Sequence, residues 1–310
     1  MTSLKVLAPF RLKPWFSERV WGKSDLRPWY ESTGTRELVG EAWLTGPACI
    51  VETGAFTGRT LTAVSVELGG EFPLLVKILF PNEKLSVQVH PDDAQAQAAG
   101  QTRGKTECWY VLEAEPGATV ALGLKAGVGA AEVAASVADG TMEELLEQVP
   151  VSVGDMLFVD AGTVHAIGPG VVLLETQQTS DITYRLYDYG RPRELHLEQG
   201  LAVIKAKTDA GKVKPRPMDG FIRLIEQKYF TVDRFDVASG KVTISNEGPA
   251  CLVSLSGSGS VKSAKGTTEL KAGQAVVLPV GSGNVVVETS DKLAFVRCMA
   301  PAKSIENLQP

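Results

Sequence analysis

The sequence predicts a mainly β protein that forms two barrels, with a small helical insertion in the first. Short runs of apolar and β-branched residues dominate the chain, as at 74–79 and 108–112, and Gly, Pro or Asp separates them. Many short strands with turn signals between them are typical of a sandwich or barrel. A segment with two prolines and alternating basic residues, 212–217, favours an extended connection between two groups of strands.

This connection and a helical pattern define the expected domains. We expect a first domain at 1–212 and a second at 215–310, on either side of the proline segment. From about 126 to 149, apolar residues recur at helical intervals, and Thr141 with Glu144 has the spacing of a capping box. We therefore place the helical insertion at 126–149.

Composition and charge argue against several classes of protein. The net charge is −5 and no basic stripe occurs, so nucleic acid is not an expected partner. The sequence has no apolar leader segment and no run of about 18 apolar residues, so we expect neither a signal peptide nor contact with a membrane. The four cysteines are far apart and form no CxxC pair, as expected of buried thiols in a reducing compartment. These features predict a cytoplasmic protein.

Four polar residues at strand ends have the composition of a metal site. In a strand, period-two alternation places Gln88 and His90 on one face. Glu107 begins another strand, and His165 follows a third after a Gly-Thr-Val turn. Imidazole and carboxylate ligands suit Zn²⁺, with iron, cobalt or manganese as competitors. These residues therefore form a candidate site for one divalent ion.

The spacing of the histidines also allows a structural role. His90 and His165 could be strand-end residues whose ring nitrogens are satisfied by hydrogen bonds. The third and last histidine, His196, begins a helix-like stretch, and we interpret it as structural. The region after His196 therefore contains no imidazole that could bind a metal.

Four motifs in a fixed order carry a family resemblance. They lie at 85–93, 104–110, 161–167 and 175–189, with earlier landmarks at 19–22 and 40–43. The motifs resemble those of the type I phosphomannose isomerases (mannose-6-phosphate isomerases) of the cupin superfamily, in their short bacterial form. The resemblance implies that both barrels are cupin (jelly-roll) barrels. The first would bind the catalytic metal, and the second would be a cupin-like β domain without a metal site.

The resemblance also assigns roles to individual residues. It implies one zinc ion per chain, held by the set Gln88, His90, Glu107 and His165. It further implies catalytic residues and a contact to the substrate phosphate, namely Arg185, Lys105 and Glu175 for catalysis and Ser86 for the phosphate. Lys105 and Arg185 are also expected to bind substrate. Either Glu175 or Lys105 could move the proton, and the sequence does not choose between them.

The orientation of Arg185 can be predicted from its neighbours. If Tyr184 and Leu186 pack outward on a strand, Arg185 points into the barrel. A guanidinium group there needs a negative partner, which could be the substrate. The alternative is an internal salt bridge to Glu175 or Asp188.

The implied activity is a metal-dependent aldose–ketose isomerisation. It interconverts mannose 6-phosphate and fructose 6-phosphate by proton transfer through an enediol, in a monomer or a weak homo-oligomer. One alternative is a metal cupin that acts on glucose 6-phosphate or another sugar. A second is a sensor or storage protein without catalysis, although Lys105 and Arg185 beside the metal set favour an enzyme.

Overall fold

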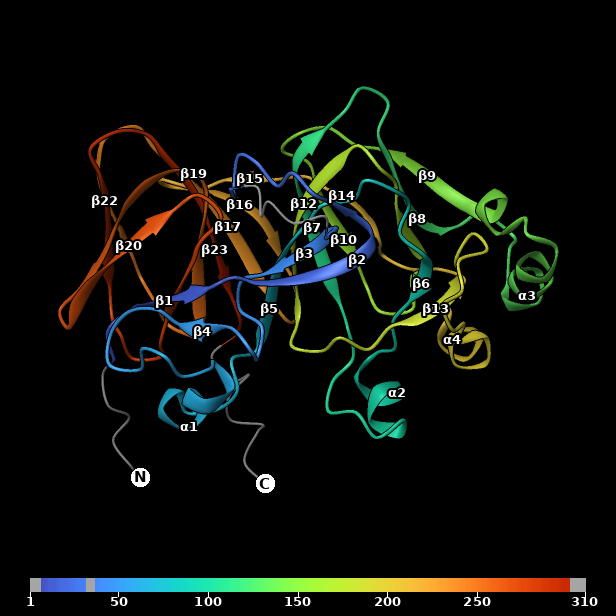
Figure 1. Cartoon of the computed structure of the whole chain (residues 1–310), viewed down its shortest axis with the longest axis horizontal. Coiled ribbons are helices and arrows are strands. Elements are labelled where there is room, and N and C mark those ends of the chain that lie inside the picture. The colour runs from blue at the N-terminus through green and yellow to red at the C-terminus, as the bar shows by residue number, and fades with distance from the viewer. Residues whose placement is uncertain (1–6, 32–36, 302–310) are drawn as a thin grey trace. The chain divides into compact units, whose positions relative to one another are not determined.

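The computed structural model describes residues 7–31 and 37–301 (Figure 1). Strands dominate it, which confirms the prediction of a mainly β protein. The chain divides into two compact units. Unit 1 takes in the chain up to Ser17, Ser24–Ile78 and the chain from Lys214, and unit 2 takes in Glu18–Lys23 and Leu79–Val213. The contacts thus group residues 24–78 with the C-terminal part of the chain, although we expected them in the first domain.

Unit 2 contains two groups of antiparallel strands. Four strands are neighbours in the order β14-β10-β7-β12, and five form a sheet in the order β13-β6-β11-β8-β9. Their bounds are β6 (Val87–Val89), β7 (Glu107–Ala114), β8 (Thr119–Leu124), β9 (Leu146–Pro150), β10 (Met156–Val159), β11 (His165–Ile167), β12 (Val171–Gln178), β13 (Tyr184–Tyr187) and β14 (Gly211–Val213).

The helices are short. In unit 2 they are α2 (Asp93–Ala98), α3 (Ala130–Asp139), the 3-10 helix η2 (Met142–Leu145) and α4 (Leu197–Val203), and in unit 1 they are η1 (Thr62–Val64) and α1 (Ser65–Leu68). Asp92 caps α2, because its side chain accepts from the backbone N–H of Gln95 while the Gln95 side chain accepts from the Asp92 N–H. No helix in the described residues is long and apolar enough to cross a membrane.

The stretch predicted as a helical insertion is only partly helical. α3 and η2 lie within it, but residues 146–149 belong to strand β9, which pairs with β8. The predicted capping box is also wrong. The Thr141 hydroxyl donates to Asp139 Oδ1 at 2.5 Å instead of capping η2. Pairing with β8 therefore overrides the helical pattern at the end of this segment.

Apolar clusters cover both faces of the five-stranded sheet. Leu122 and Ile167 belong to a cluster that also contains Trp109 of β7. Ala166 and Leu186 face the other way, into a cluster with residues of α3 and α4. The sheet is therefore packed on both sides, and strand alternation decides which residues face β7.

Unit 1 is built mainly from one large sheet. Its core strands follow the order β15-β16-β17-β23-β19-β21-β1-β4, with β18, β20 and β22 attached. Asp233 is buried in this sheet between Arg223 and Arg297, at 2.7 and 2.6 Å. The strand bounds are β1 (Phe10–Lys13), β3 (Val39–Trp43), β4 (Ile50–Val51), β15 (Arg216–Pro217), β16 (Ile222–Glu226), β17 (Thr231–Val237), β18 (Gly240–Ile244), β19 (Ala250–Ser263), β20 (Gly266–Lys271), β21 (Ala275–Leu278), β22 (Val285–Thr289) and β23 (Leu293–Met299), while β2 (Trp15–Lys23) and β5 (Leu74–Leu79) have residues in both units. All four cysteines are buried free thiols, as predicted.

Gly104 allows two segments of unit 2 to meet closely beside β7. A Cβ atom at this position would lie 2.5 Å from the carbonyl oxygen of Pro91 and 2.5 Å from the carbonyl carbon of Asp92. The next residue, Lys105, donates its backbone N–H to Pro91 O at 3.0 Å. Only glycine fits between these backbones without moving one of them.

We predict that Gly104→Ala destabilises the protein by about 1–3 kcal/mol, because the added methyl group meets backbone atoms that cannot rotate away. The measurement is the midpoint of urea unfolding. Gly129→Ala is the matched control, since a Cβ there meets its nearest atom, Glu132 Oε2, at an ordinary 3.4 Å. Equal destabilisation by both variants would contradict the prediction.

Candidate active site

Neighbouring strands of the five-stranded sheet place three predicted site residues in one row. Arg185 of β13 lies opposite Gln88 of β6, and Gln88 lies opposite His165 of β11. Opposite residues in an antiparallel pair project from the same face. The next residue in the row, Leu122, packs in the cluster with Trp109 of β7. The row therefore faces β7.

The two predicted histidine ligands are held in the same tautomer. His165 Nδ1 lies 2.9 Å from the carbonyl oxygen of Thr163, and His90 Nδ1 lies 2.9 Å from that of Ile182. A carbonyl oxygen can only accept, so Nδ1 carries the proton in each ring and Nε2 keeps its lone pair. Backbone carbonyls often fix metal-binding histidines in this way.

Glu107 lies fully buried between these two rings. Its Oε1 is 3.5 Å from His165 Nε2, and its Oε2 is 3.7 Å from His90 Nε2. Lys105 Nζ lies 2.8 Å from Oε2, but neither carboxylate oxygen accepts a well-aligned hydrogen bond from the described residues. A buried carboxylate with so few partners is costly. The surroundings of Glu107 therefore fit a further positive partner.

Burial keeps His165 neutral. Loss of hydration is the largest effect on its pKa, and the Lys105 ammonium acts in the same direction, so the pKa falls to about 4. The Thr163 carbonyl and the charge of Glu175 oppose this shift only partly. At neutral pH the ring is therefore uncharged and can offer its Nε2 lone pair to a cation.

The separations of Glu107 from the two histidine rings fit one metal ion. Nitrogen or oxygen atoms of His90, Glu107 and His165 lie within 4.8 Å of one another. Two atoms that bind one zinc ion at about 2.1 Å can be at most about 4.2 Å apart. The distances from Glu107 to the two rings are shorter than this limit. The set is therefore a candidate metal site.

Gln88 lies at the edge of this set. Its Nε2 is 3.2 Å from His165 Nε2. Rotation of the amide by half a turn exchanges Nε2 and Oε1, so an oxygen can occupy the same place. Gln88 can therefore join the ligands through its oxygen or remain a hydrogen-bond partner of His165.

Lys105 and Glu175 lie close to the ligands. Lys105 Nζ is 3.1 Å from His90 Nε2, and its side chain is only 4% exposed. Glu175 is buried on β12 opposite Trp109, and its charge is felt at His165. Both predicted proton-transfer residues thus lie on the same side of unit 2 as the candidate metal site.

Arg185 points away from its strand neighbours, as predicted. Tyr184 and Leu186 pack in the cluster with α4, which leaves the opposite face to Arg185. Its Nη1 donates to the carbonyl oxygen of Glu194 at 2.6 Å, whereas its buried Nε has no partner in the described part of the chain. The Nε–H group of Arg185 is therefore available to donate to a ligand.

Asp188, one of the two acids that could form an internal salt bridge with Arg185, is bound by other arginines. Asp188 binds Arg191 at 2.7 Å and Arg193 at 2.6 Å. Burial, and then repulsion from Arg193, lower the pKa of Arg185 below its ordinary value. The guanidinium thus lies beside like charges rather than in a closed ion pair.

Ser86 is buried directly before β6, two residues from Gln88. Strand alternation therefore places its side chain on the Gln88 face. The contact of Ser86 with the substrate phosphate stays a prediction.

Two buried residues beside the site were not predicted. The Trp109 ring lies 5.5 Å from that of His165, and its Nε1 has no hydrogen-bond partner in the described residues. Gln177 lies opposite Glu107 on β12, with Oε1 likewise without a partner there. A period-two pattern could have found both, since Trp109 is two residues from Glu107 and Gln177 is two residues from Glu175.

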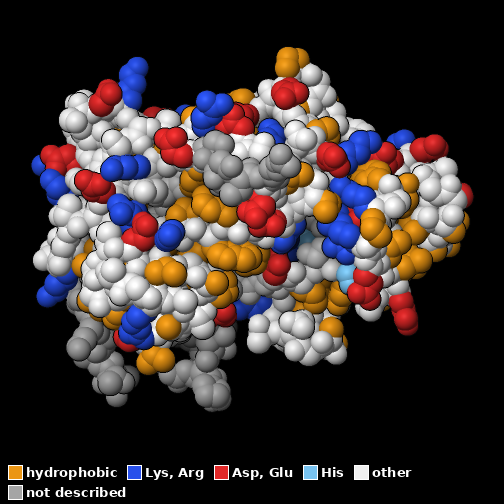
Figure 2. All heavy atoms as spheres, in the orientation of Figure 1, with side chains coloured by type: hydrophobic (Ala, Val, Ile, Leu, Met, Phe, Trp, Pro, Cys, Tyr) orange, Lys and Arg blue, Asp and Glu red, His pale blue; other side chains and the backbone are white. Residues whose placement is uncertain are grey.

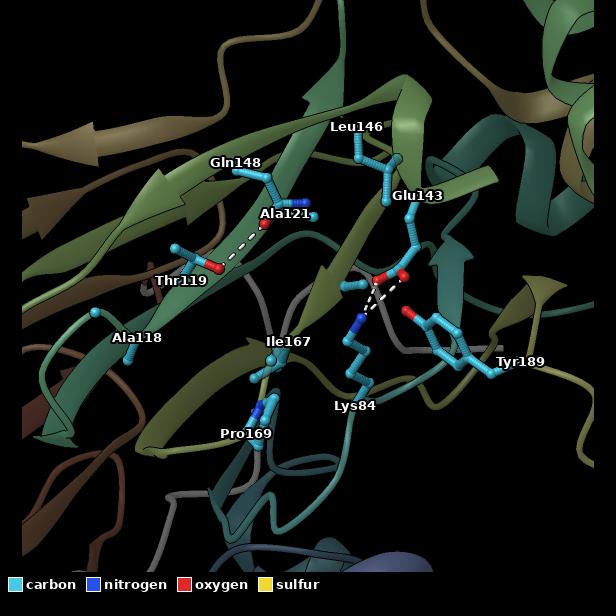
Figure 3. A pocket seen from close by; sticks show the side chains of 13 residues that line it. Lys84, Ala118, Thr119, Ala121, Glu143, Leu146, Gln148, Ile167, Pro169 and Tyr189 are labelled. Atoms are coloured by element: carbon cyan, nitrogen blue, oxygen red, sulfur yellow. Dashed lines mark hydrogen bonds and ion pairs between the residues drawn. The ribbon is translucent and has the colours of Figure 1, made fainter. Parts of the chain in front are cut away.

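A separate pocket of about 400 Å³ lies away from these residues (Figure 3). Lys84 and Glu143 form an ion pair of 2.7 Å there, beside Tyr189. None of the predicted site residues lines this pocket. We therefore assign the pocket no part in the chemistry of the metal set.

Two parts of the chain match known families. Residues 50–123 match the catalytic domain of type I phosphomannose isomerases, and residues 222–298 match the cupin domain of mannose-6-phosphate isomerases. The chain is 35% identical over 305 residues to a mannose-6-phosphate isomerase of Bacillus subtilis, which covers 90% of this chain and 96% of the relative. The chain belongs to the type I phosphomannose isomerase family. It is therefore an isomerase, and the family resemblance is confirmed.

A second relative and a solved structure agree with this result. A mannose-6-phosphate isomerase of Streptococcus mutans is 35% identical over 294 residues, covering 87% of this chain and 92% of the relative. The crystal structure of the mannose 6-phosphate isomerase from Bacillus subtilis superposes with a TM-score of 0.82 at 30% identity, covering 94% and 99% of the two chains. The fold is thus the cupin-type fold of the family.

We predict that His90→Ala and His165→Ala each lose the bound metal, because each removes an Nε2 donor from the set. Metal content per chain, measured by mass spectrometry after gel filtration, should fall from about one ion to a small fraction. His196→Ala is the matched control and should keep its metal, since His196 lies outside the set. Full metal content in either ligand variant would remove that histidine from the site.

Proposed function

We propose that this protein is a zinc-dependent isomerase that interconverts mannose 6-phosphate and fructose 6-phosphate. The observation that carries the proposal is the buried Glu107 carboxylate between the Nε2 atoms of His90 and His165. The names of the relatives support the choice of substrate. One zinc ion per chain would be held by these three residues and Gln88.

The reaction moves protons within the sugar and needs no redox partner. One proton leaves C2 of the open-chain aldose and one is added at C1, while a hydroxyl proton passes from O2 to O1. The species between them is an enediol, and its formation places negative charge on the sugar oxygens. A bound zinc ion supplies positive charge for these oxygens.

Lys105 and Glu175 are the two candidates for carrying the proton between C2 and C1. Both are buried near the ligands, where little water competes for the proton. Glu175 can accept a proton as a carboxylate, whereas Lys105 must first be neutral. The contact between Lys105 and Glu107 favours Glu175 as base, because it stabilises the charged form of Lys105.

Arg185 would stabilise negative charge in the transition state. A guanidinium group stays protonated and therefore does not act as a base. Its Nε lies buried with no partner among the described residues, on the face that also carries Gln88 and His165. Donation from this group to the enediolate fits the chemistry, and Ser86 would contact the phosphate group.

We also propose the domain roles that follow from the family. Residues 1–212 would form the catalytic domain, with a small helical insertion made of α3 and η2, and residues 215–310 would form a second cupin-like barrel without metal. The protein would work in the cytoplasm as a monomer or a weak homo-oligomer. The match of residues 222–298 to the cupin domain of mannose-6-phosphate isomerases supports the second barrel, and the match of residues 50–123 to the catalytic domain of type I phosphomannose isomerases supports the first domain.

We predict that the purified protein converts mannose 6-phosphate to fructose 6-phosphate in a coupled assay. Dialysis against a chelator should abolish this turnover, because the negative charge on the sugar oxygens then lacks the positive charge of the metal ion. Added zinc should restore the turnover. Undiminished turnover by protein shown to be metal-free would refute the metal dependence. Turnover of glucose 6-phosphate in preference to mannose 6-phosphate would refute the choice of substrate.

We predict that Arg185→Ala lowers kcat about 10²-fold or more, the effect of losing one transition-state contact. Its metal content and thermal midpoint should stay near those of the parent protein, since Arg185 holds no ion pair with a described residue. Arg216→Ala, at an exposed arginine of unit 1, is the control for loss of a positive charge. An unchanged kcat in Arg185→Ala would exclude the residue from catalysis.

A further inference from the structure

The backbone of Arg185 is held by a single residue outside the sheet. β13 is the end strand of the five-stranded sheet, so one of its edges has no partner strand within that order. At this edge the Arg185 N–H donates to His196 Nδ1 at 3.2 Å, and the His196 N–H donates to the Arg185 carbonyl oxygen at 2.7 Å. His196 thus accepts one hydrogen bond from the Arg185 backbone and donates another to it, as a residue of a neighbouring strand would.

The same segment also holds the Arg185 side chain. Two residues before His196, the carbonyl oxygen of Glu194 accepts from Arg185 Nη1 at 2.6 Å. Glu194 and His196 therefore hold the guanidinium group and the backbone of Arg185, respectively. Nε, the nitrogen nearest the backbone, has no hydrogen-bond partner among residues 7–31 and 37–301.

From these contacts we infer that His196 is a positioning residue for Arg185, which sets where the guanidinium group meets the substrate. The inference rests on the proposed catalytic role of Arg185. It extends our interpretation of His196 as a structural residue.

The place of His196 is itself fixed by helix α4. His196 directly precedes α4, and its carbonyl oxygen accepts the N–H of Gly200 at 2.8 Å. A Cβ atom at Gly200 would lie 2.5 Å from Leu186 Cδ2, so the missing side chain lets α4 pack closely against β13. Figure 1 shows α4 beside β13 and β6. Helix α4 therefore holds His196 beside the backbone of Arg185.

Electrostatic repulsion from neighbouring arginines also acts on Arg185. Arg193 and Arg191 lie near enough to Arg185 to act on its charge, and both are bound to the buried Asp188. Figure 2 shows Lys and Arg side chains gathered beside a histidine on the face where β13 and β6 lie in Figure 1. The positive charges of Arg193 and Arg191 repel Arg185, and the carboxylate of Asp188 offsets this only in part. The contacts from Glu194 and His196 oppose a displacement of Arg185.

A double-mutant cycle tests this inference. His196→Ala should lower kcat for mannose 6-phosphate at least about tenfold, because a shift of about 1 Å in a positioned group can cost up to about 10²-fold. In the Arg185→Ala background the same substitution should change kcat less than about twofold, since the group that it positions is gone. Metal content should stay at the parent value in all three variants.

A second comparison serves if His196→Ala folds poorly. Asn places its side-chain oxygen near the position of His Nδ1, so His196→Asn keeps an acceptor for the Arg185 N–H, whereas His196→Gln places its polar group near Nε2 instead. We expect kcat close to the parent value for His196→Asn and a loss for His196→Gln. Leu195→Ala, at an exposed neighbour, is the matched control and should leave kcat unchanged.

The outcomes separate this inference from the proposed function. Equal losses from His196→Ala in both backgrounds, or equal kcat in His196→Asn and His196→Gln, would overturn the positioning role. Loss of kcat in Arg185→Ala without loss in His196→Ala would also overturn it, while the role of Arg185 would stand. An unchanged kcat in Arg185→Ala would overturn the proposed role of Arg185 itself.

Discussion

The burial of the Glu107 carboxylate is the constraint on which the site depends. The two neighbouring imidazole rings are held with Nε2 unprotonated. They therefore do not neutralise the negative charge of Glu107, which still needs a positive partner. Removing the partner of a buried charge typically costs about 3–5 kcal/mol. Lys105 supplies one positive charge at 2.8 Å, and the remaining unsatisfied oxygens make a cation the natural completion of the set. The fold thus tolerates a locally unfavourable group at the place where chemistry needs it.

Strand alternation allows one sheet to provide both stability and chemistry. On β13 and β11, Leu186 and Ala166 pack into an apolar cluster with α3 and α4, while Arg185 and His165 project from the opposite face. A shift of register by one residue would exchange the two sets. The apolar packing behind the sheet therefore fixes the register, and with it the direction of every site residue in the row.

Local sequence patterns indicated most residues of the candidate site, but few of the tertiary contacts that hold these residues in place. Period-two alternation placed Gln88 beside His90, and the family resemblance identified Arg185, whose orientation then followed from Leu186. Contacts between distant segments could not be read in this way. The approach of Gly104 to the backbone at 91–93, and the grouping of residues 24–78 with the C-terminal part of the chain, depend on tertiary packing. The same is true of β9, whose pairing with β8 overrides a helical pattern.

The distribution of charge is compatible with an anionic substrate, as we propose, although the protein is acidic. The chain carries a net charge of −5, yet Arg185, Arg191 and Arg193 gather at one edge of the five-stranded sheet. Asp188 makes this possible, because one buried carboxylate bound to two guanidinium groups lowers their mutual repulsion and still leaves the cluster positive. Screening by salt limits the reach of such partly exposed charges to about 8 Å. The cluster would therefore act on the phosphate group of the proposed substrate only near the site, where the net charge of the chain has little influence.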